Sequence, residues 1–182
     1  MAEITYFKIA GKDNTKDVLE LALKRYKQGD IDRVVIASTY GDTASQAAEL
    51  FKSTGAKLVI VGEVLDGQQN PSQELQNKLQ AQGHQILWGL PLGAMSAFTR
   101  EHTATMVADA YRRISEGFKV VCEIVLIATS LGYLRTGQKV ISVAGTSRGA
   151  DTAIVATAAA FTEFKNFEVN EILCKPYQRT KE

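Results

Sequence analysis

Val35-Ile-Ala-Ser-Thr-Tyr-Gly-Asp-Thr-Ala44 is an apolar run that ends in a loop rich in Ser, Thr and Gly. Ala144-Gly-Thr-Ser-Arg-Gly-Ala-Asp-Thr-Ala153 is a second such loop, and it follows the apolar run Val140–Ala144. A short, continuous apolar run is typical of a strand buried on both faces of a parallel sheet. We therefore predict strands at Arg33–Ser38 and Lys139–Gly145. Each polar loop follows directly on the carboxyl end of one of these strands.

The rest of the chain alternates between strand and helix patterns. Further strands are predicted at 4–10, 57–62, 84–89, 152–158 and 168–174.

Helices are predicted between these strands. One begins at Asn14, which we interpret as an N-cap with Asp17 as its capping-box partner. Others begin after Gly41 and at Asn70-Pro71, with proline at the first helical position, and one covers Thr99 to about Glu116.

The run from Val120 to Leu131 is ambiguous. Its β-branched residues favour a strand, whereas its length favours a buried helix. Glu123 is the one charged residue between Lys119 and Arg135. A carboxylate in that setting needs a partner or a raised pKa, so we weigh a proton-transfer role against a structural link.

Alternating strands and helices imply right-handed crossovers and an α/β fold with three layers around a largely parallel sheet. No linker, repeat or low-complexity tract divides the chain, so we expect one domain over residues 1–182. Ligands of such folds bind at the carboxyl ends of strands, where the strand order reverses. If the two loop-bearing strands are neighbours there, their loops face each other across one crevice.

Composition narrows the function classes. The chain has 182 residues, 45% hydrophobic and 23% charged, which is typical of a globular domain. The formal net charge of +1 provides no broad basic field, so neither nucleic acid nor membrane is an expected partner. The first 17 residues lack a signal-peptide pattern, and we expect a cytoplasmic protein, compatible with a homo-oligomer. Cys122 and Cys174 lie in apolar runs and are interpreted as buried thiols.

The first loop has the features of an anion site. Ser38 and Thr39 end the strand, Gly41 permits a tight turn, and Thr43 begins a helix. The start of a helix offers N–H groups and the positive end of the dipole, and hydroxyls add further donors. The alternative is a plain helix cap in which Asp42 or Thr43 satisfies those N–H groups.

The second loop places Arg148 between two glycines. Arginine can hold a phosphate through two parallel N–H bonds, and Asp151 could orient it or accept ribose or ribityl hydroxyls. The alternative is a surface turn with an Arg–Asp pair. The candidate ligand-binding residues here are Gly145, Thr146, Ser147, Arg148, Gly149, Asp151 and Thr152. Neither loop matches the Walker A or GxGxxG pattern.

Other candidates lie outside the loops. Lys12 and Asn14 can reach the site from the first turn of their helix, although capping explains Asn14 equally well. Tyr40 is the best candidate to contact a flat ring, whereas core packing is favoured for Trp88 and Phe98.

The two histidines, His84 and His102, have no Ser, Cys or acidic residue at a spacing typical of a catalytic triad or metal site. No triad or metal site is therefore predicted.

Several motifs resemble stand-alone prokaryotic proteins related to the C-terminal α/β domain of pyruvate kinase. The likeness runs nearly end to end. Besides the two opening segments, it rests on Tyr6-Phe7, on Gly11-Lys12-Asp13-Asn14-Thr15 and on Val121-Cys-Glu-Ile124. The spacing from Thr39 to Ala44 also resembles the loop with which pyruvate kinase holds a phosphate of its sugar-bisphosphate effector.

This resemblance implies a five-stranded core sheet of order 3-2-1-4-5 with the last strand antiparallel. It places the strand before Ser38 beside the strand before Gly145 and favours a helix for Val120 to Leu131. It also implies flavin mononucleotide (FMN) as the ligand. The barrel domain of pyruvate kinase is absent, so kinase activity is not implied. Residues 88–98 are apolar where related chains often carry a polar segment.

Three functions follow as hypotheses. The first is an FMN-binding protein, compatible with a flavin-dependent oxidoreductase. The second is a sensor or regulatory module for a phosphorylated metabolite, without catalysis. The third is an enzyme on a phosphorylated substrate with Asp42, Asp151 or Glu123 as acid or base.

Overall fold

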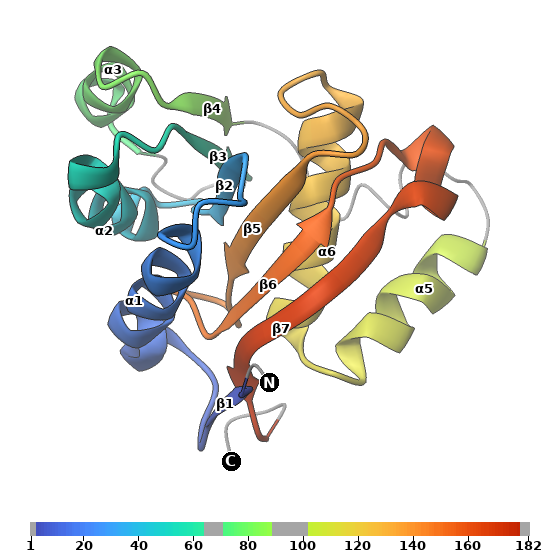
Figure 1. Ribbon diagram of the computed structural model, residues 1–182. Helices are drawn as coiled ribbons and strands as arrows, with labels where there is room; N and C mark the ends of the chain where they lie inside the picture. The colour runs from blue at the N-terminus through green and yellow to red at the C-terminus, as the bar shows by residue number, and fades with distance from the viewer. Residues whose placement is uncertain (1–2, 64–70, 89–101, 179–182) are drawn as a thin grey trace.

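A seven-stranded mixed sheet forms the centre of the fold (Figure 1). The computed structural model describes residues 3–63, 71–88 and 102–178. The strands are β1 (Thr5–Phe7), β2 (Arg33–Ala37), β3 (Leu58–Gly62), β4 (Gln85–Trp88), β5 (Lys139–Ala144), β6 (Thr152–Thr157) and β7 (Glu168–Pro176). A strand therefore forms within or close to each predicted range.

The sheet order is β1-β7-β6-β5-β2-β3-β4. β6 is antiparallel to both of its neighbours, and the other pairs are parallel. The sheet is thus larger than the five-stranded core that the resemblance implies, because β7 and β1 extend it beyond β6.

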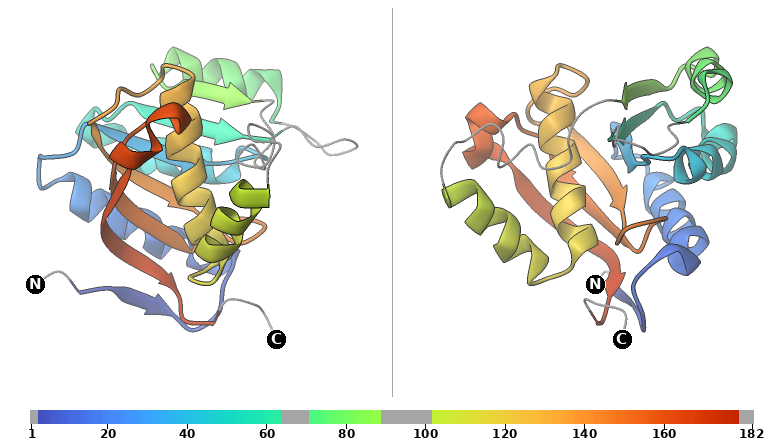
Figure 2. Two further views of the ribbon diagram at one scale, coloured as in Figure 1. Left: turned by 90° about the vertical axis from the view of Figure 1, so that its right-hand side faces the viewer. Right: turned by 180° about the vertical axis from the view of Figure 1, so that it is seen from behind.

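Helices cover both faces of this sheet and make the three expected layers (Figures 1 and 2). The helices are α1 (Thr15–Tyr26), α2 (Asp42–Phe51), α3 (Gln73–Ala81), α5 (His102–Arg112) and α6 (Glu116–Ser130). Short 3-10 turns cover Lys12–Asn14, Lys52–Thr54 and Phe161–Asn166. Helices α1, α2 and α3 lie on one face, and α5 and α6 lie on the other.

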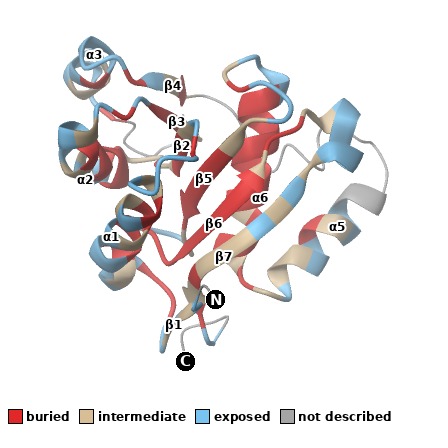
Figure 3. Ribbon diagram, in the orientation of Figure 1, coloured by how far each residue is buried: buried red, intermediate tan, exposed pale blue. Residues whose placement is uncertain are grey.

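Each face has its own hydrophobic core. On one side Leu19 and Phe51, from α1 and α2, pack with sheet residues such as Ile36. On the other side α6 contributes Ile124 against sheet residues such as Val35. Buried residues dominate β5, β6 and α6, whereas exposed residues lie on the outer sides of α1 and α3 (Figure 3).

The ambiguous run is helical. Every residue from Gly117 to Thr129 except Val120 is buried in α6, which explains why an amphipathic period is hard to see. The helix predicted to reach Glu116 instead ends at Arg112, because Ser115 adopts an extended conformation and its Oγ accepts a hydrogen bond from the Phe118 amide (2.9 Å). Residues 99–101 of that prediction lie outside the described ranges.

One predicted cap and one predicted helix start need correction. Asn14 holds the N-cap position of α1, but its side chain forms no cap and instead donates to the carbonyls of Ile9 and Gly11. α3 starts at Gln73 rather than at Pro71, because the Ser72 hydroxyl caps it.

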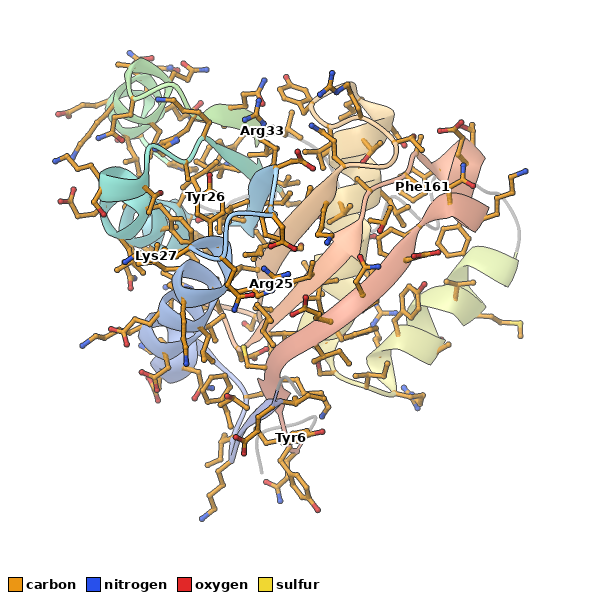
Figure 4. All side chains as sticks on the ribbon, viewed as in Figure 1. Tyr6, Arg25, Tyr26, Lys27, Arg33 and Phe161 are labelled. Atoms are coloured by element: carbon orange, nitrogen blue, oxygen red, sulfur yellow. The ribbon has the colours of Figure 1, made fainter. Side chains whose placement is uncertain are left out.

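Arg25 ties α1 to the sheet (Figure 4). Its buried guanidinium donates hydrogen bonds to Asp30 and, on β7, to Glu171. The hydrogen bond from Arg25 holds the pKa of the Asp30 carboxyl well below its usual range.

The two cysteines are buried free thiols, as predicted. Burial raises the pKa of both, and that of Cys174 reaches about 12. Within the described ranges, no helix is both long enough and apolar enough to cross a membrane.

Candidate functional site

Both polar loops emerge from neighbouring strands at one edge of the sheet. β2 and β5 pair in parallel with Ile36 opposite Val143, so Ser38 and Gly145 leave the strands at the same level. From β2 the chain passes through α2 on one face, whereas α6 leads into β5 from the opposite face. The connections therefore diverge between β2 and β5, which is where ligands bind in open α/β sheets.

A cavity of about 400 Å³ lies between these loops and the helices behind the sheet. Its walls contain these predicted site residues: Ser38, Thr39, Tyr40, Asp42, Thr43, Gly145, Ser147, Arg148 and Gly149. The remaining lining residues are Ala37, Glu63, Arg112, Glu116, Lys119 and Val120. We call this the main cavity. The predicted residues Lys12, Asn14, Gly41, Thr146, Asp151 and Thr152 are not among its lining residues.

The loop from Ser38 to Thr43 is held from the side of β3 and β4. The Ser38 amide donates to the Val61 carbonyl (2.8 Å), and the Trp88 indole N–H donates to the Thr39 carbonyl (3.1 Å). Gly41 is buried with φ of 89°, a conformation that favours glycine. Trp88 is therefore an anchor of the loop.

The first turn of α2 lines the main cavity and has free backbone donors. The Ala44 amide donates to Ser38 Oγ (3.1 Å) and the Ser45 amide to the Gly41 carbonyl (2.9 Å). Within the described part of the chain, the amides of Asp42 and Thr43 have no acceptor. The capping role considered for Asp42 or Thr43 is thus carried by Ser38, and the first two amides remain available at the positive end of the helix dipole.

Asp151 holds the second loop from beneath. The residue is 0% exposed, and its carboxylate accepts from the amides of Gly11 and Thr146 and from the Thr152 hydroxyl. The bond from Gly11 fixes the loop to the segment before α1, and the bonds from Thr146 and Thr152 hold the loop itself together. Asp151 therefore supports the loop instead of pairing with Arg148.

Arg148 bridges the two loops at the mouth of the main cavity. Its guanidinium carbon lies 4.3 Å from the centroid of the Tyr40 ring, a cation–π contact. Ser147 precedes it with φ of 68°, the one positive φ of a non-glycine residue in the described ranges. At Gly149 (φ 73°) an added Cβ would collide with Thr15 and Lys12. The loop conformation that presents Arg148 thus depends on this close packing.

The opposite wall carries two ion pairs from α5 and α6. Arg112 donates to Glu116 (2.9 Å), and Lys119 donates to Glu123 (2.5 Å). The Lys119 and Glu123 side chains are only 4% and 0% exposed. Glu123 was a candidate from the sequence, whereas Lys119 was not. The sequence feature that could have identified Lys119 is its i,i+4 spacing from Glu123, because opposite charges at this spacing pair on a helix. The feature is informative only if the segment is assigned as a helix.

The charges of the main cavity distinguish Arg148 from the other cations. Arg112 and Lys119 each have a carboxylate partner. Arg148 forms no salt bridge with any residue of the described ranges. Together with the α2 amides, its exposed guanidinium provides the donors that a phosphate requires.

The remaining candidates lie elsewhere. His84 is buried, and its Nδ1 accepts a hydrogen bond from the Leu58 amide (3.2 Å). Phe98 and the side chain of His102 lie outside what the structure describes. Among the described residues, no group of three or more His, Cys, Asp or Glu side chains is arranged to hold a metal ion.

A scan of the sequence against models of known protein families finds no match.

Proposed function

We propose that this protein binds FMN in the main cavity, with the phosphate between the start of α2 and Arg148. The observation that carries the proposal is the pairing of β2 with β5. It brings both loops to one cavity, which is lined by Asp42, Thr43 and Arg148.

The described residues fit such a ligand. A volume of about 400 Å³ falls in the range of small-molecule sites, roughly 300–1,000 Å³. Ala37 and Val120 offer apolar contact to a ring, and Tyr40 lies beside the phosphate end. On the far wall, Lys119 is a donor for ring carbonyl oxygens. A bound flavin accepts and donates electrons or hydride, which is the basis for a flavin-dependent oxidoreductase.

The strand order supports the family resemblance on which the choice of FMN rests. Within the seven-stranded sheet, β4, β3, β2, β5 and β6 follow one another, and β6 is antiparallel. This run corresponds to the implied order 3-2-1-4-5.

Native mass spectrometry and absorbance of the purified protein test the proposal. We expect a flavin mass that dissociates on denaturation, or a yellow complex once FMN is added. A colourless protein that binds no measurable FMN contradicts the proposal.

A second function is favoured by the polarity of the far wall. Arg112, Glu116 and Lys119 line it, and such side chains also suit the hydroxyls of a sugar phosphate. The protein would then be a sensor or regulatory module for a phosphorylated metabolite. Thermal-shift measurements with sugar phosphates, nucleotides and flavins separate the two. Stabilisation by flavins alone contradicts the sensor.

A further inference from the structure

A second cavity, of about 570 Å³, lies beside the main cavity. It is formed by the segment that begins α1, the first turn of α2 and the loop around Arg148. Asp42, Thr43, Arg148 and Gly149 line both cavities. Arg148 therefore stands between the two, and its five N–H donors can serve an anion in each.

Polar donors converge on this second cavity. Thr43 is only 4% exposed, and its hydroxyl forms no hydrogen bond with any residue of the described ranges. Lys12 and Lys16 line the cavity. Lys16 has only a loose pair, 3.9 Å from Glu20, with both side chains largely exposed, so its charge remains available.

The balance of charge differs between the two cavities. The main cavity has three cations (Arg112, Lys119 and Arg148) and three carboxylates (Asp42, Glu63 and Glu116). The second cavity has three cations (Lys12, Lys16 and Arg148) and two carboxylates (Asp13 and Asp42). The positive excess therefore lies on the second-cavity side of Arg148.

We propose that the second cavity is a further phosphate subsite and that the ligand class of the protein includes compounds with a chain of two or three phosphates. The first phosphate binds at the start of α2, so the inference rests on the proposed function. The chain then passes Arg148 and Thr43, and the terminal phosphate binds Lys12 and Lys16. This extends the ligand class from FMN to flavin and other nucleotides that carry a diphosphate or triphosphate.

Isothermal titration with inorganic phosphate, tripolyphosphate and FMN tests the subsite. We expect the wild-type protein to bind tripolyphosphate at least about tenfold more tightly than phosphate, since Lys12 and Lys16 add charge-assisted hydrogen bonds to the terminal phosphate. The double variant Lys12→Ala/Lys16→Ala should lose this preference. Both lysines are exposed, so the fold should tolerate the change.

Two control variants make the test specific. Lys24→Ala/Lys27→Ala removes the same charge at the other end of α1 and should keep the preference. Lys12→Arg/Lys16→Arg preserves charge and should keep it too. Equal binding of phosphate and tripolyphosphate by the wild-type protein, or a preference that persists in Lys12→Ala/Lys16→Ala, overturns the subsite. Failure of the wild-type protein to bind FMN is a separate result and contradicts the proposed function.

Discussion

Arg148 is the side chain on which the proposed phosphate binding should depend most, because it is the cation of the main cavity without a carboxylate partner in the described ranges. Arg148→Ala should weaken FMN binding by about 1–3 kcal/mol, the contribution of a charge-assisted hydrogen bond. Fluorescence titration measures the change. Arg135→Ala is the matched control, because this exposed arginine precedes β5 at the opposite end of the strand. Unchanged affinity in Arg148→Ala would place the phosphate elsewhere.

Lys119 and Glu123 should depend on each other for stability. Both are buried, so removing one partner leaves an uncompensated charge in the core. Lys119→Met or Glu123→Leu alone should cost about 3–5 kcal/mol of unfolding free energy in urea. The double variant Lys119→Met/Glu123→Leu should cost less than either single change. A double variant as unstable as the sum of the two single variants would show that the pair is not coupled.

Local patterns predicted the loop residues that line the main cavity, because glycine, hydroxyls and a helix start are signals within a few positions. The supporting role of Asp151 could not be predicted from such local patterns. Its carboxylate accepts from Gly11, which is 140 positions away in the sequence, and only the fold brings these residues together. Lys119 was missed for a related reason, since its partner is apparent only on a helix.

The start of α6 packs tightly against the residues at the start of β6. A Cβ added at Gly117 would collide with Asp151 and Thr152. Gly117→Ala should therefore destabilise the protein by about 1–3 kcal/mol through overpacking. It should do so although alanine favours a helix by about 1 kcal/mol over glycine. Urea unfolding measures the difference. A gain in stability would mean that helix propensity outweighs the contact.

The strands were predicted closely because short apolar runs between turn residues are distinctive. The break between α5 and α6 was not predicted, because Ser115 lies in a run that could continue as one helix. Ser115 separates the two helices because its hydroxyl accepts from the Phe118 amide and its side chain is fully buried. Burial is a property of the packed molecule and is not visible in the local sequence.

In the molecule as a whole, strand order could not be derived from the residues, because it depends on pairing between distant segments. The pairing of β2 with β5, which creates the main cavity, joins residues more than 100 positions apart. The family resemblance implied that these two strands are adjacent. It did not imply that β7 and β1 extend the sheet.

Acid should weaken the whole fold partly through His84. Burial lowers the pKa of this histidine below its ordinary value of 6.5, so the unfolded chain binds a proton before the folded protein does. The contribution of His84 to stability is present above pH 6.5 and decreases as the pH falls below it. His84→Gln should therefore show a smaller loss of unfolding free energy between pH 7 and 5 than the wild-type protein. Equal losses would contradict the assignment.

The central claim is that the two loops at the ends of β2 and β5 hold a phosphate. The most direct measurement compares the dissociation constants of FMN and riboflavin, which differ only in that phosphate. Charge-assisted hydrogen bonds from Arg148 and the α2 amides predict at least about tenfold tighter binding of FMN. Equal affinity for the two flavins would contradict the account.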